Sequence, residues 1–314
     1  MAGRILVIRG GAIGDFVLTL PVFSALRAQF PKAHLEVLGY PHIARLAEVG
    51  GLVDLVAPIE ARALAGFFAR GGSLDPEMAS HFSRFDLIIS FLFDPDQIFR
   101  TNVGLCAKAQ FIQGPHRPPA DATIHATEVF LKPLEQLAIF GADPTPRLRI
   151  EERAVPRSLA EDLGAGSWIA GHPGSGSEAK NWPEANWEGL FHSIIGQTNH
   201  NILLIGGEAE GDRLKRLAKA LPAERIRVAQ SRPLAELAKL ILQCEHFVGH
   251  DSGISHLASA LGLKGIILWG ETSSTIWRPR SDAIKTLHSP DGLKSLSPDT
   301  VSTAILESLV PKPR

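Results

Sequence analysis

An acidic residue follows a glycine-rich turn near the start of the sequence. Residues 5–20 read Ile-Leu-Val-Ile-Arg-Gly-Gly-Ala-Ile-Gly-Asp-Phe-Val-Leu-Thr-Leu, which is typical of a strand that runs into a tight turn and then a helix. A ligand can approach the backbone closely at such a turn. A carboxylate held there could act as a general base, so we predict that Asp15 takes a proton from an acceptor hydroxyl. Because Asp is also among the best helix caps, a purely structural cap is the alternative interpretation.

The same turn disfavours two common nucleotide-binding motifs. Gly10, Gly11 and Gly14 give GGxxG instead of the dinucleotide pattern GxGxxG. Residues 38–40 read Leu-Gly-Tyr, where an acid would be expected at the end of the next strand. No Gly-Lys-Ser/Thr follows the turn, so it is not a P-loop either. An NAD-dependent enzyme is therefore only a third alternative.

A second glycine-rich loop carries the groups expected of a phosphate site. Residues 168–183 read Trp-Ile-Ala-Gly-His-Pro-Gly-Ser-Gly-Ser-Glu-Ala-Lys-Asn-Trp-Pro, a strand and a loop before a helix that opens at Pro183. Backbone amides, hydroxyls, a cation and a helix N-terminus together suit a diphosphate. We predict that Lys180 stabilises a leaving phosphate without a metal. The alternative is a solvated loop whose lysine is merely exposed.

A third segment offers another helix N-terminus. Residues 246–261 read His-Phe-Val-Gly-His-Asp-Ser-Gly-Ile-Ser-His-Leu-Ala-Ser-Ala-Leu, with His256 in the first turn of the expected helix. Its free amides and the Ser252 hydroxyl could hold a phosphate or a sugar hydroxyl. A histidine bonded to a neighbouring carbonyl is the alternative role for His256. A Ser-His-Asp hydrolase is disfavoured, because the nucleophile motif GxSxG needs its serine one position earlier.

Two further patterns resemble metal sites, but a structural role explains them better. Asp94 and Asp96 flank a proline after an apolar run, as paired metal-binding carboxylates do. Asp before Pro commonly opens a helix, and we favour this capping role. The chain has 12 histidines, but no HExxH or CxxC spacing occurs. We therefore predict that no metal is bound.

Short apolar runs alternate with longer amphipathic stretches along the chain, as in parallel sheets covered by helices. We expect strands at residues 5–8, 35–38, 52–58, 87–91, 109–112, 168–171, 201–205, 225–228, 246–248 and 265–269. We expect helices near residues 16–29, 42–49, 61–70, 76–84, 96–107, 123–140, 183–196, 208–220, 233–243, 254–261 and 298–309. Pro21 falls inside the first of these, so that helix either starts or kinks there.

Both halves of the chain begin with a strand, a glycine-rich turn and a helix. This predicts an α/β fold with two Rossmann-like domains that face each other across a cleft, with ligands at the carboxyl ends of the strands. A polar segment that ends in Pro156 suggests domains of residues 1–153 and 154–314. Residues 147–150 either close the first sheet or begin the linker.

Composition excludes several classes of protein. Lys plus Arg number 32 against 33 for Asp plus Glu, a net charge of -1, so we expect no nucleic-acid partner. The apolar runs are far shorter than the ~20 residues of a membrane helix. The first residues show no signal-peptide pattern. The chain has only two cysteines, which fits a protein of a reducing compartment. We expect a cytoplasmic protein.

Tryptophan and arginine are unevenly distributed. All five Trp lie in the second half, where they could stack on a base or sugar, although core packing is the commoner explanation. Arg62, Arg70, Arg100 and Arg117 are scattered through segments of the first half that could border the cleft. Since Arg suits carboxylate and phosphate groups, we assign acceptor-binding roles to Arg62 and Arg100, with Gly14 and Asp15. Surface solvation is the alternative for each arginine.

Four ordered motifs resemble glycosyltransferase family 9, the ADP-heptose:lipopolysaccharide heptosyltransferases. Residues 14–21 are similar to the family's GD…LP segment, and residues 171–183 to its donor-phosphate loop. Residues 251–256 are similar to its D-[TS]-G-x-x-H segment, and residues 268–272 to its strand and G-x-T turn. The resemblance covers nearly the whole chain.

The resemblance implies a GT-B fold, inverting sugar transfer without a metal, and an ADP-sugar as co-substrate with no other cofactor. Its first domain would bind the acceptor and its second the ADP-sugar. Asp15 would be the base. By position in the family motifs, Lys180 and either Ser175 or Ser177, on both sides of Gly176, would hold the diphosphate. Glu208 or Glu210 would hold the ribose. The residues around the sugar and phosphates would be Asp251, Ser252, Gly253 and His256.

The same resemblance implies a heptose, or a related sugar, transferred to a lipopolysaccharide core or another glycan acceptor. We expect the protein to be a monomer. It would meet a lipid-linked acceptor at the cytoplasmic face of the inner membrane. The alternative function is a non-catalytic nucleotide-sugar-binding protein on the same scaffold. Two positions depart from the family pattern: His250 stands where a small or amide residue is commoner, and Glu271 replaces a usual proline.

Overall fold

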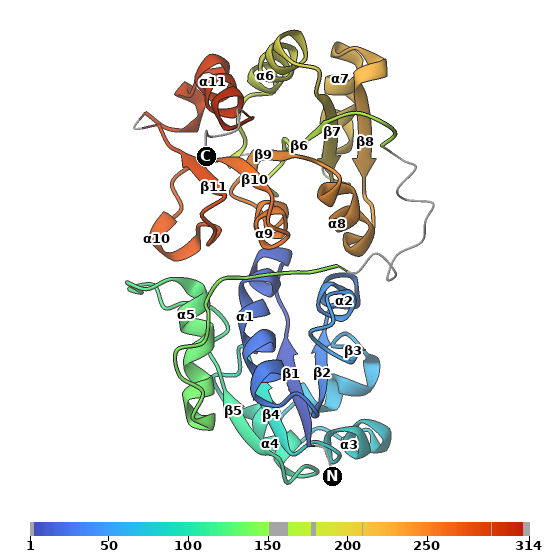
Figure 1. The fold of residues 1–314 in the computed structure, drawn as a ribbon. Helices are drawn as coiled ribbons and strands as arrows, with labels where there is room; N and C mark the ends of the chain where they lie inside the picture. Colours follow the sequence, from blue (N-terminus) through green and yellow to red (C-terminus); the bar gives the residue numbers. More distant parts are fainter. Residues whose placement is uncertain (1–2, 151–162, 177–179, 209, 290, 310–314) are drawn as a thin grey trace. The chain divides into compact units, whose positions relative to one another are not determined.

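The chain divides into two compact units, residues 1–150 and 151–314. The computed structural model describes residues 3–150, 163–176, 180–208, 210–289 and 291–309. The predicted boundary between residues 153 and 154 lies outside the described residues. Each unit contains one parallel sheet with helices on both faces (Figure 1).

The first unit contains a five-stranded sheet in the order β3-β2-β1-β4-β5. Its strands are β1 (Arg4–Arg9), β2 (His34–Gly39), β3 (Leu55–Pro58), β4 (Leu87–Ser90) and β5 (Gln110–Gln113). All pairings are parallel, with Ile8 of β1 opposite Leu38 of β2 and Ser90 of β4. The strand order reverses between β1 and β4. Ligands of open α/β sheets bind at such a switch point, beyond the carboxyl ends of the strands.

Two groups of helices cover the first sheet. One group comprises α1 (Ile13–Gln29), α2 (Pro41–Val49) and α5 (Ala126–Leu131), which packs on α1 and continues into the 3₁₀ helix η2 (Lys132–Leu137). The other comprises the 3₁₀ helix η1 (Arg62–Phe68), α3 (Pro76–Phe82) and α4 (Ile98–Gly104). Buried Phe67, Phe82 and Phe99 of this second group pack against Leu6 and Ile8 of β1. Alternate residues of β1 therefore face different helix layers.

Helix α1 begins before Pro21 and continues through it, so a helix start at Pro21 is wrong. A proline inside a helix costs about 3 kcal/mol through its missing N–H and its ring clash. Phe16, Val17 and Leu20 of the preceding turns are fully buried, and burying each such side chain contributes about 1.5–3 kcal/mol. The burial of these residues outweighs the cost of the proline.

The second unit contains a six-stranded parallel sheet in the order β11-β10-β9-β6-β7-β8. Its strands are β6 (Trp168–His172), β7 (Asn201–Gly206), β8 (Ile226–Gln230), β9 (His246–His250), β10 (Lys264–Leu268) and β11 (Ile284–Leu287). Its helices are α6 (Glu184–Gln197), α7 (Gly211–Ala220), α8 (Leu234–Leu242), α9 (Gly253–Ala260), α10 (Ser274–Trp277) and α11 (Pro298–Leu309), with short 3₁₀ helices η6 (Ala223–Arg225) and η7 (Leu293–Ser295). The switch point of this sheet lies between β6 and β9.

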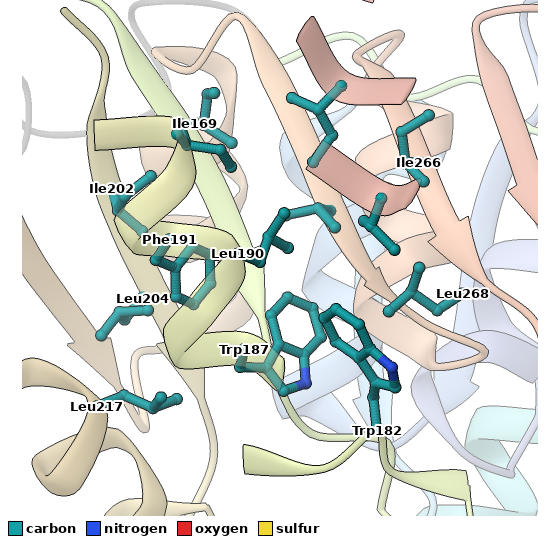
Figure 2. Packing of buried hydrophobic residues seen from close by; sticks show 14 of the residues in the cluster. Ile169, Trp182, Trp187, Leu190, Phe191, Ile202, Leu204, Leu217, Ile266 and Leu268 are labelled. Atoms are coloured by element: carbon teal, nitrogen blue, oxygen red, sulfur yellow. The ribbon is translucent and has the colours of Figure 1, made fainter. Parts of the chain in front are cut away.

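Helices α6, α7 and α11 enclose the main core of the second unit. Figure 2 shows Leu190 and Phe191 of α6 among the strand residues of this cluster. Trp182 and Trp187 pack edge to face with ring centroids 5.4 Å apart. Trp168, Trp182, Trp187 and Trp269 are all at most 3% exposed, which confirms the core-packing explanation for four of the five tryptophans.

Each strand expected from the sequence is present, but some expectations were wrong. Residues 147–150 form no strand, so the proposal that they close the first sheet fails. Two elements were not predicted: β11, a partly exposed edge strand with too few apolar residues to stand out, and the single turn of α10. None of the helices in the described part of the chain is both long and apolar enough to cross a membrane.

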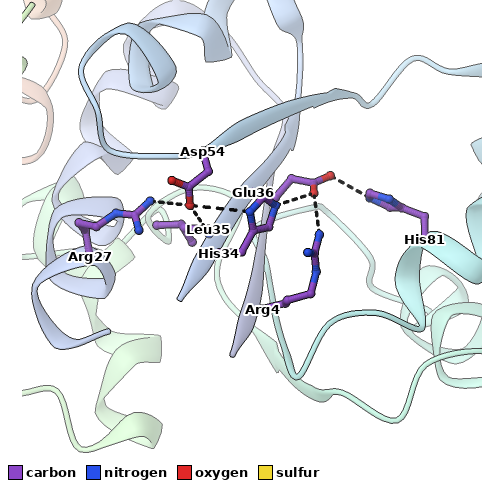
Figure 3. A network of polar contacts seen from close by, with 7 residues as sticks. All are labelled: Arg4, Arg27, His34, Leu35, Glu36, Asp54 and His81. Atoms are coloured by element: carbon purple, nitrogen blue, oxygen red, sulfur yellow. Dashed lines mark hydrogen bonds and ion pairs between the residues drawn. The ribbon is translucent and has the colours of Figure 1, made fainter. Parts of the chain in front are cut away.

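A network of charged groups lies at the amino ends of β1 and β2, the edge opposite the switch point (Figure 3). Glu36 is fully buried, and its carboxylate lies 2.9 Å from Nε2 of His81 and 3.5 Å from Nε2 of His34. Asp54 accepts hydrogen bonds from Arg27 and from the N–H of Leu35. Burial raises the pKa of Asp54, but these bonds and nearby positive charges outweigh it and lower the pKa overall.

Candidate active site

In the first unit, the turn after β1 places Asp15 beyond the switch point of the sheet. Gly11 adopts a φ of +97°, which favours glycine, and a Cβ there would lie 2.9 Å from Oδ2 of Asp15. Asp15 occupies the third position of α1, and its Oδ2 accepts the N–H of Ala12, 3.1 Å away. A capping contact is therefore present, with Ala12 as the N-cap residue. The Asp15 side chain is still one-third exposed, so its carboxylate also reaches solvent.

A buried arginine positions this turn. Arg9 is 2% exposed, and it donates hydrogen bonds to the carbonyls of His116, at 2.8 Å, and Asp15, at 3.2 Å. Its guanidinium lies 4.6 Å from the centroid of the Phe130 ring and 3.7 Å from Oδ1 of Asp15. Burial lowers the pKa of Arg9 to about 10, and the Asp15 charge partly opposes this shift. Arg9 is therefore a cation at neutral pH, next to the carboxylate.

Sequence reasoning missed Arg9, although a signal was present. A charged residue that ends an otherwise apolar strand and precedes a glycine-rich turn is unusual, because burying a charge is costly unless it has partners. The position of Arg9 in the sequence therefore indicated that its charge has a specific partner in the fold.

The arginines assigned to the acceptor also follow carboxyl ends of strands. Arg62 opens η1 after β3, and Arg100 lies in the first turn of α4 after β4; both are exposed. The parallel topology places these segments at the same edge of the sheet as Asp15. The carboxylate of Asp94 accepts the N–H groups of Phe99 and Arg100, so it makes a capping contact with the first turn of α4. The helix begins at Ile98 with Gln97 as the N-cap residue, so an opening at the proline after Asp94 is wrong.

In the second unit, the loops after β6 and β9 meet across the switch point. Nζ of Lys180, from the loop after β6, lies 2.9 Å from Oδ2 of Asp251, which follows β9. Within the first loop, the Ser175 hydroxyl donates to Oδ1 of Asn181 at 2.8 Å. Two segments assigned to one site from the sequence are therefore in direct contact. Ser177 lies outside the described residues.

The start of α9 is arranged as the sequence suggested. Ser252 is the N-cap, and its hydroxyl accepts the N–H of Ser255 and lies 3.2 Å from Nδ1 of His172. Gly253 begins the helix, and His256 is buried in its first turn. The N-terminal amides of α9 therefore lie beside the Lys180–Asp251 pair.

The two acids considered for the ribose differ in environment. Glu208 is exposed, whereas Glu210 is 9% exposed and its Oε2 accepts the N–H of Gly207 at 2.9 Å. Glu210 packs directly on the loop after β6, because a Cβ added to Gly174 would lie 2.3 Å from Cγ of Glu210. Gly176, farther along this loop, is exposed with a φ of +73°.

Residues 133–302, more than half of the chain, match the family model described as glycosyltransferase family 9 (heptosyltransferase). The chain belongs to glycosyltransferase family 9. Lipooligosaccharide heptosyltransferase 2 of Haemophilus influenzae is 24% identical to this glycosyltransferase over 310 residues, which cover 89% of this chain and 86% of that one.

Solved structures share the fold of this glycosyltransferase. The structure of E. coli ADP-heptose LPS heptosyltransferase II matches with a TM-score of 0.78 at 17% identity, over 98% of both chains. E. coli heptosyltransferase WaaC with ADP matches with a TM-score of 0.73 at 19% identity, over 97% of this chain and 99% of that one. The predicted fold class, α/β with two Rossmann-like sheets of the GT-B type, is confirmed.

Proposed function

We propose that this glycosyltransferase moves a heptose, or a closely related sugar, from an ADP-sugar to a lipopolysaccharide core or similar glycan, with inversion and without a metal. The observation that carries the proposal is the contact of Lys180 with Asp251 beside the N-terminus of α9. A cation, the N-terminal amides of a helix and a hydroxyl at one switch point suit a nucleoside diphosphate. The names of the similar proteins point to ADP-heptose as the donor.

Lys180 would gain a second partner when the donor binds. In the described structure its ammonium group pairs with Asp251, and the Lys180 side chain is 45% exposed. A diphosphate carries more negative charge than one carboxylate, so we expect Lys180 to contact the phosphates while Asp251 remains its second partner. This positive charge, together with the helix amides, would stabilise the leaving ADP, which is the task that a metal ion performs elsewhere.

Asp15 would act as the general base on the acceptor. Its carboxylate would remove the proton of an acceptor hydroxyl as that oxygen bonds to the anomeric carbon of the donor. The bond from this carbon to the phosphate oxygen breaks, the electron pair leaves with ADP, and the configuration inverts. Arg9 would orient Asp15, since its guanidinium donates to the main-chain carbonyl of Asp15 and lies 3.7 Å from Oδ1 of the carboxylate. Exposed Arg62 and Arg100 would bind acidic groups of the acceptor.

The test is transfer from ADP-heptose to a deacylated lipopolysaccharide core, with the anomeric configuration of the product read by NMR. The proposal predicts an inverted product, ADP release, and an unchanged rate after dialysis against EDTA. A retained configuration would refute the mechanism. A rate that falls with EDTA and recovers with Mg²⁺ would refute metal independence. A donor preference for UDP- or GDP-sugars would refute the assignment of ADP.

A further inference from the structure

We infer that His250 is a positioning residue that holds together the two described ends of the donor-phosphate loop, residues 173–176 and 180–182, for donor binding. This inference rests on the proposed function, since it assigns the loop to the donor. His250 ends β9 and is fully buried, one residue before Asp251. Its imidazole ring therefore does not contact the donor and acts through the loop.

The ring bonds to both ends of this loop. Nε2 of His250 accepts the main-chain N–H of Trp182 at 2.8 Å. Nδ1 lies 3.3 Å from the carbonyl oxygen of Gly174. One side chain thus joins Gly174, at the start of the glycine-rich turn, to Trp182, two residues before α6 begins at Glu184.

These two partners dictate the protonation state of the ring. A nitrogen that accepts an N–H must carry a lone pair, and a carbonyl oxygen can only accept, so the proton must lie on Nδ1. An imidazolium ion could not accept the Trp182 N–H at all. Burial lowers the pKa of His250 to about 4, against an opposing contribution from the Gly174 carbonyl. The charged groups that affect it, Arg213 and Asp251, have opposite effects on this pKa.

Packing fixes the ring in this position. The imidazole meets the indole of Trp187 edge to face, with centroids 5.2 Å apart. The next residue, Asp251, holds Lys180 of the same loop. The last residue of β9 and the residue after it therefore hold the backbone at Gly174 and Trp182 and the cation of Lys180. Preorganisation of this kind reduces the entropy lost when a ligand binds.

The test compares three variants by titration calorimetry with ADP and by steady-state kinetics. Methionine and glutamine side chains are similar in length, but methionine can neither accept nor donate these hydrogen bonds. We expect His250→Met to weaken ADP binding and raise the donor KM by about tenfold, because the buried Trp182 N–H loses its acceptor. The acceptor KM should stay unchanged, and His250→Gln, whose amide oxygen can accept the same N–H, should recover most of the affinity.

His246→Met is the matched control for general destabilisation. His246 is equally buried at the opposite end of the same strand, with its Nε2 2.7 Å from the Ser308 hydroxyl. We expect this variant to lower Tm without weakening ADP binding. An ADP affinity of His250→Met within threefold of wild type would overturn the inference while leaving the proposed function intact. Failure of the wild-type protein to bind ADP would instead refute the proposed function.

A spectroscopic measurement on the wild-type protein tests the same claim independently of any variant's folding. Nitrogen-15 chemical shifts of His250 report which ring nitrogen carries the proton. The geometry predicts the Nδ1–H tautomer at pH 7, with slow hydrogen exchange at the Trp182 amide. An Nε2–H tautomer, or an imidazolium ion at pH 7, would contradict the two bonds on which the inference rests.

Discussion

Acidification from pH 7 to pH 5 should destabilise the second unit, because three of its buried histidines resist protonation. Burial lowers the pKa of His172 to about 3, with a smaller contribution from His250. Burial also lowers the pKa values of His246 and His250 to about 4. An unfolded histidine titrates at about pH 6.5, so between about pH 6.5 and 4 the unfolded chain binds protons that the native state does not. Stability is therefore fully present above this window and falls as the pH drops through it.

The size of the effect follows from these shifts. A pH of 5 lies about 1.5 units below the pKa of a histidine in the unfolded chain. Each unit corresponds to about 1.4 kcal/mol, so each of these histidines lowers the free energy of unfolding by about 2 kcal/mol. The three together lower the free energy of unfolding by roughly 6 kcal/mol. Single domains are stable by about 5–15 kcal/mol, so this loss is a large fraction of the stability of the second unit.

Tryptophan fluorescence is a selective probe for this experiment, because all five tryptophans belong to the second unit. Urea unfolding followed by this signal should show a midpoint lower by roughly 2 M or more at pH 5. His246→Gln removes one of the three groups and should reduce the pH dependence by about a third. His192→Gln, at a half-exposed position, is the control and should leave it unchanged. Equal unfolding free energies at pH 5 and pH 7 would refute this reasoning.

Three further substitutions test particular contacts. Arg9→Met should lower kcat by about tenfold or more while ADP affinity stays unchanged, because it removes the cation beside Asp15; an unchanged kcat would show that Arg9 does not position the base. Gly174→Ala should weaken ADP binding by about tenfold, because its Cβ would collide with Glu210, whereas Gly196→Ala, in open space, should not; equal ADP affinities for the two would contradict the described packing. Glu36→Ala should destabilise the first unit by about 3 kcal/mol, because His34, His81 and Arg4 lose a buried partner. Thermal unfolding followed by circular dichroism measures this effect. An unchanged thermal transition would contradict a stabilising role of the charged network around Glu36.

Much of the fold could be predicted from the sequence because parallel strands buried on both faces appear as continuous apolar runs. Leu6, Val7 and Ile8 of β1 show this directly, since all three are fully buried. The edge strand β11 could not be predicted in this way, because Lys285 and Thr286 interrupt its short apolar run. The alternative start of α1 at Pro21 was wrong, because the burial that stabilises the turns before Pro21 depends on tertiary packing.

The candidate site was predictable where loops follow strands, and less so where side chains interact at long range. Lys180 was identified from a glycine-rich loop and Asp251 from the family resemblance, but their contact spans 71 positions of sequence. Arg9 and His250 were not assigned roles, because their importance comes from partners that only the fold brings near. For His250 the sequence showed only an unusual residue type, with no indication of the two bonds that its ring makes.

The central claim, that Asp15 is the catalytic base, is tested most directly by Asp15→Asn. Asn keeps an oxygen that can accept the N–H of Ala12, so the helix cap and the thermal stability should be preserved. ADP affinity should also be unchanged, while kcat for sugar transfer falls by about 100-fold or more, because an amide cannot take the acceptor proton. A stable Asp15→Asn protein that transfers heptose at a rate within tenfold of wild type would contradict the account.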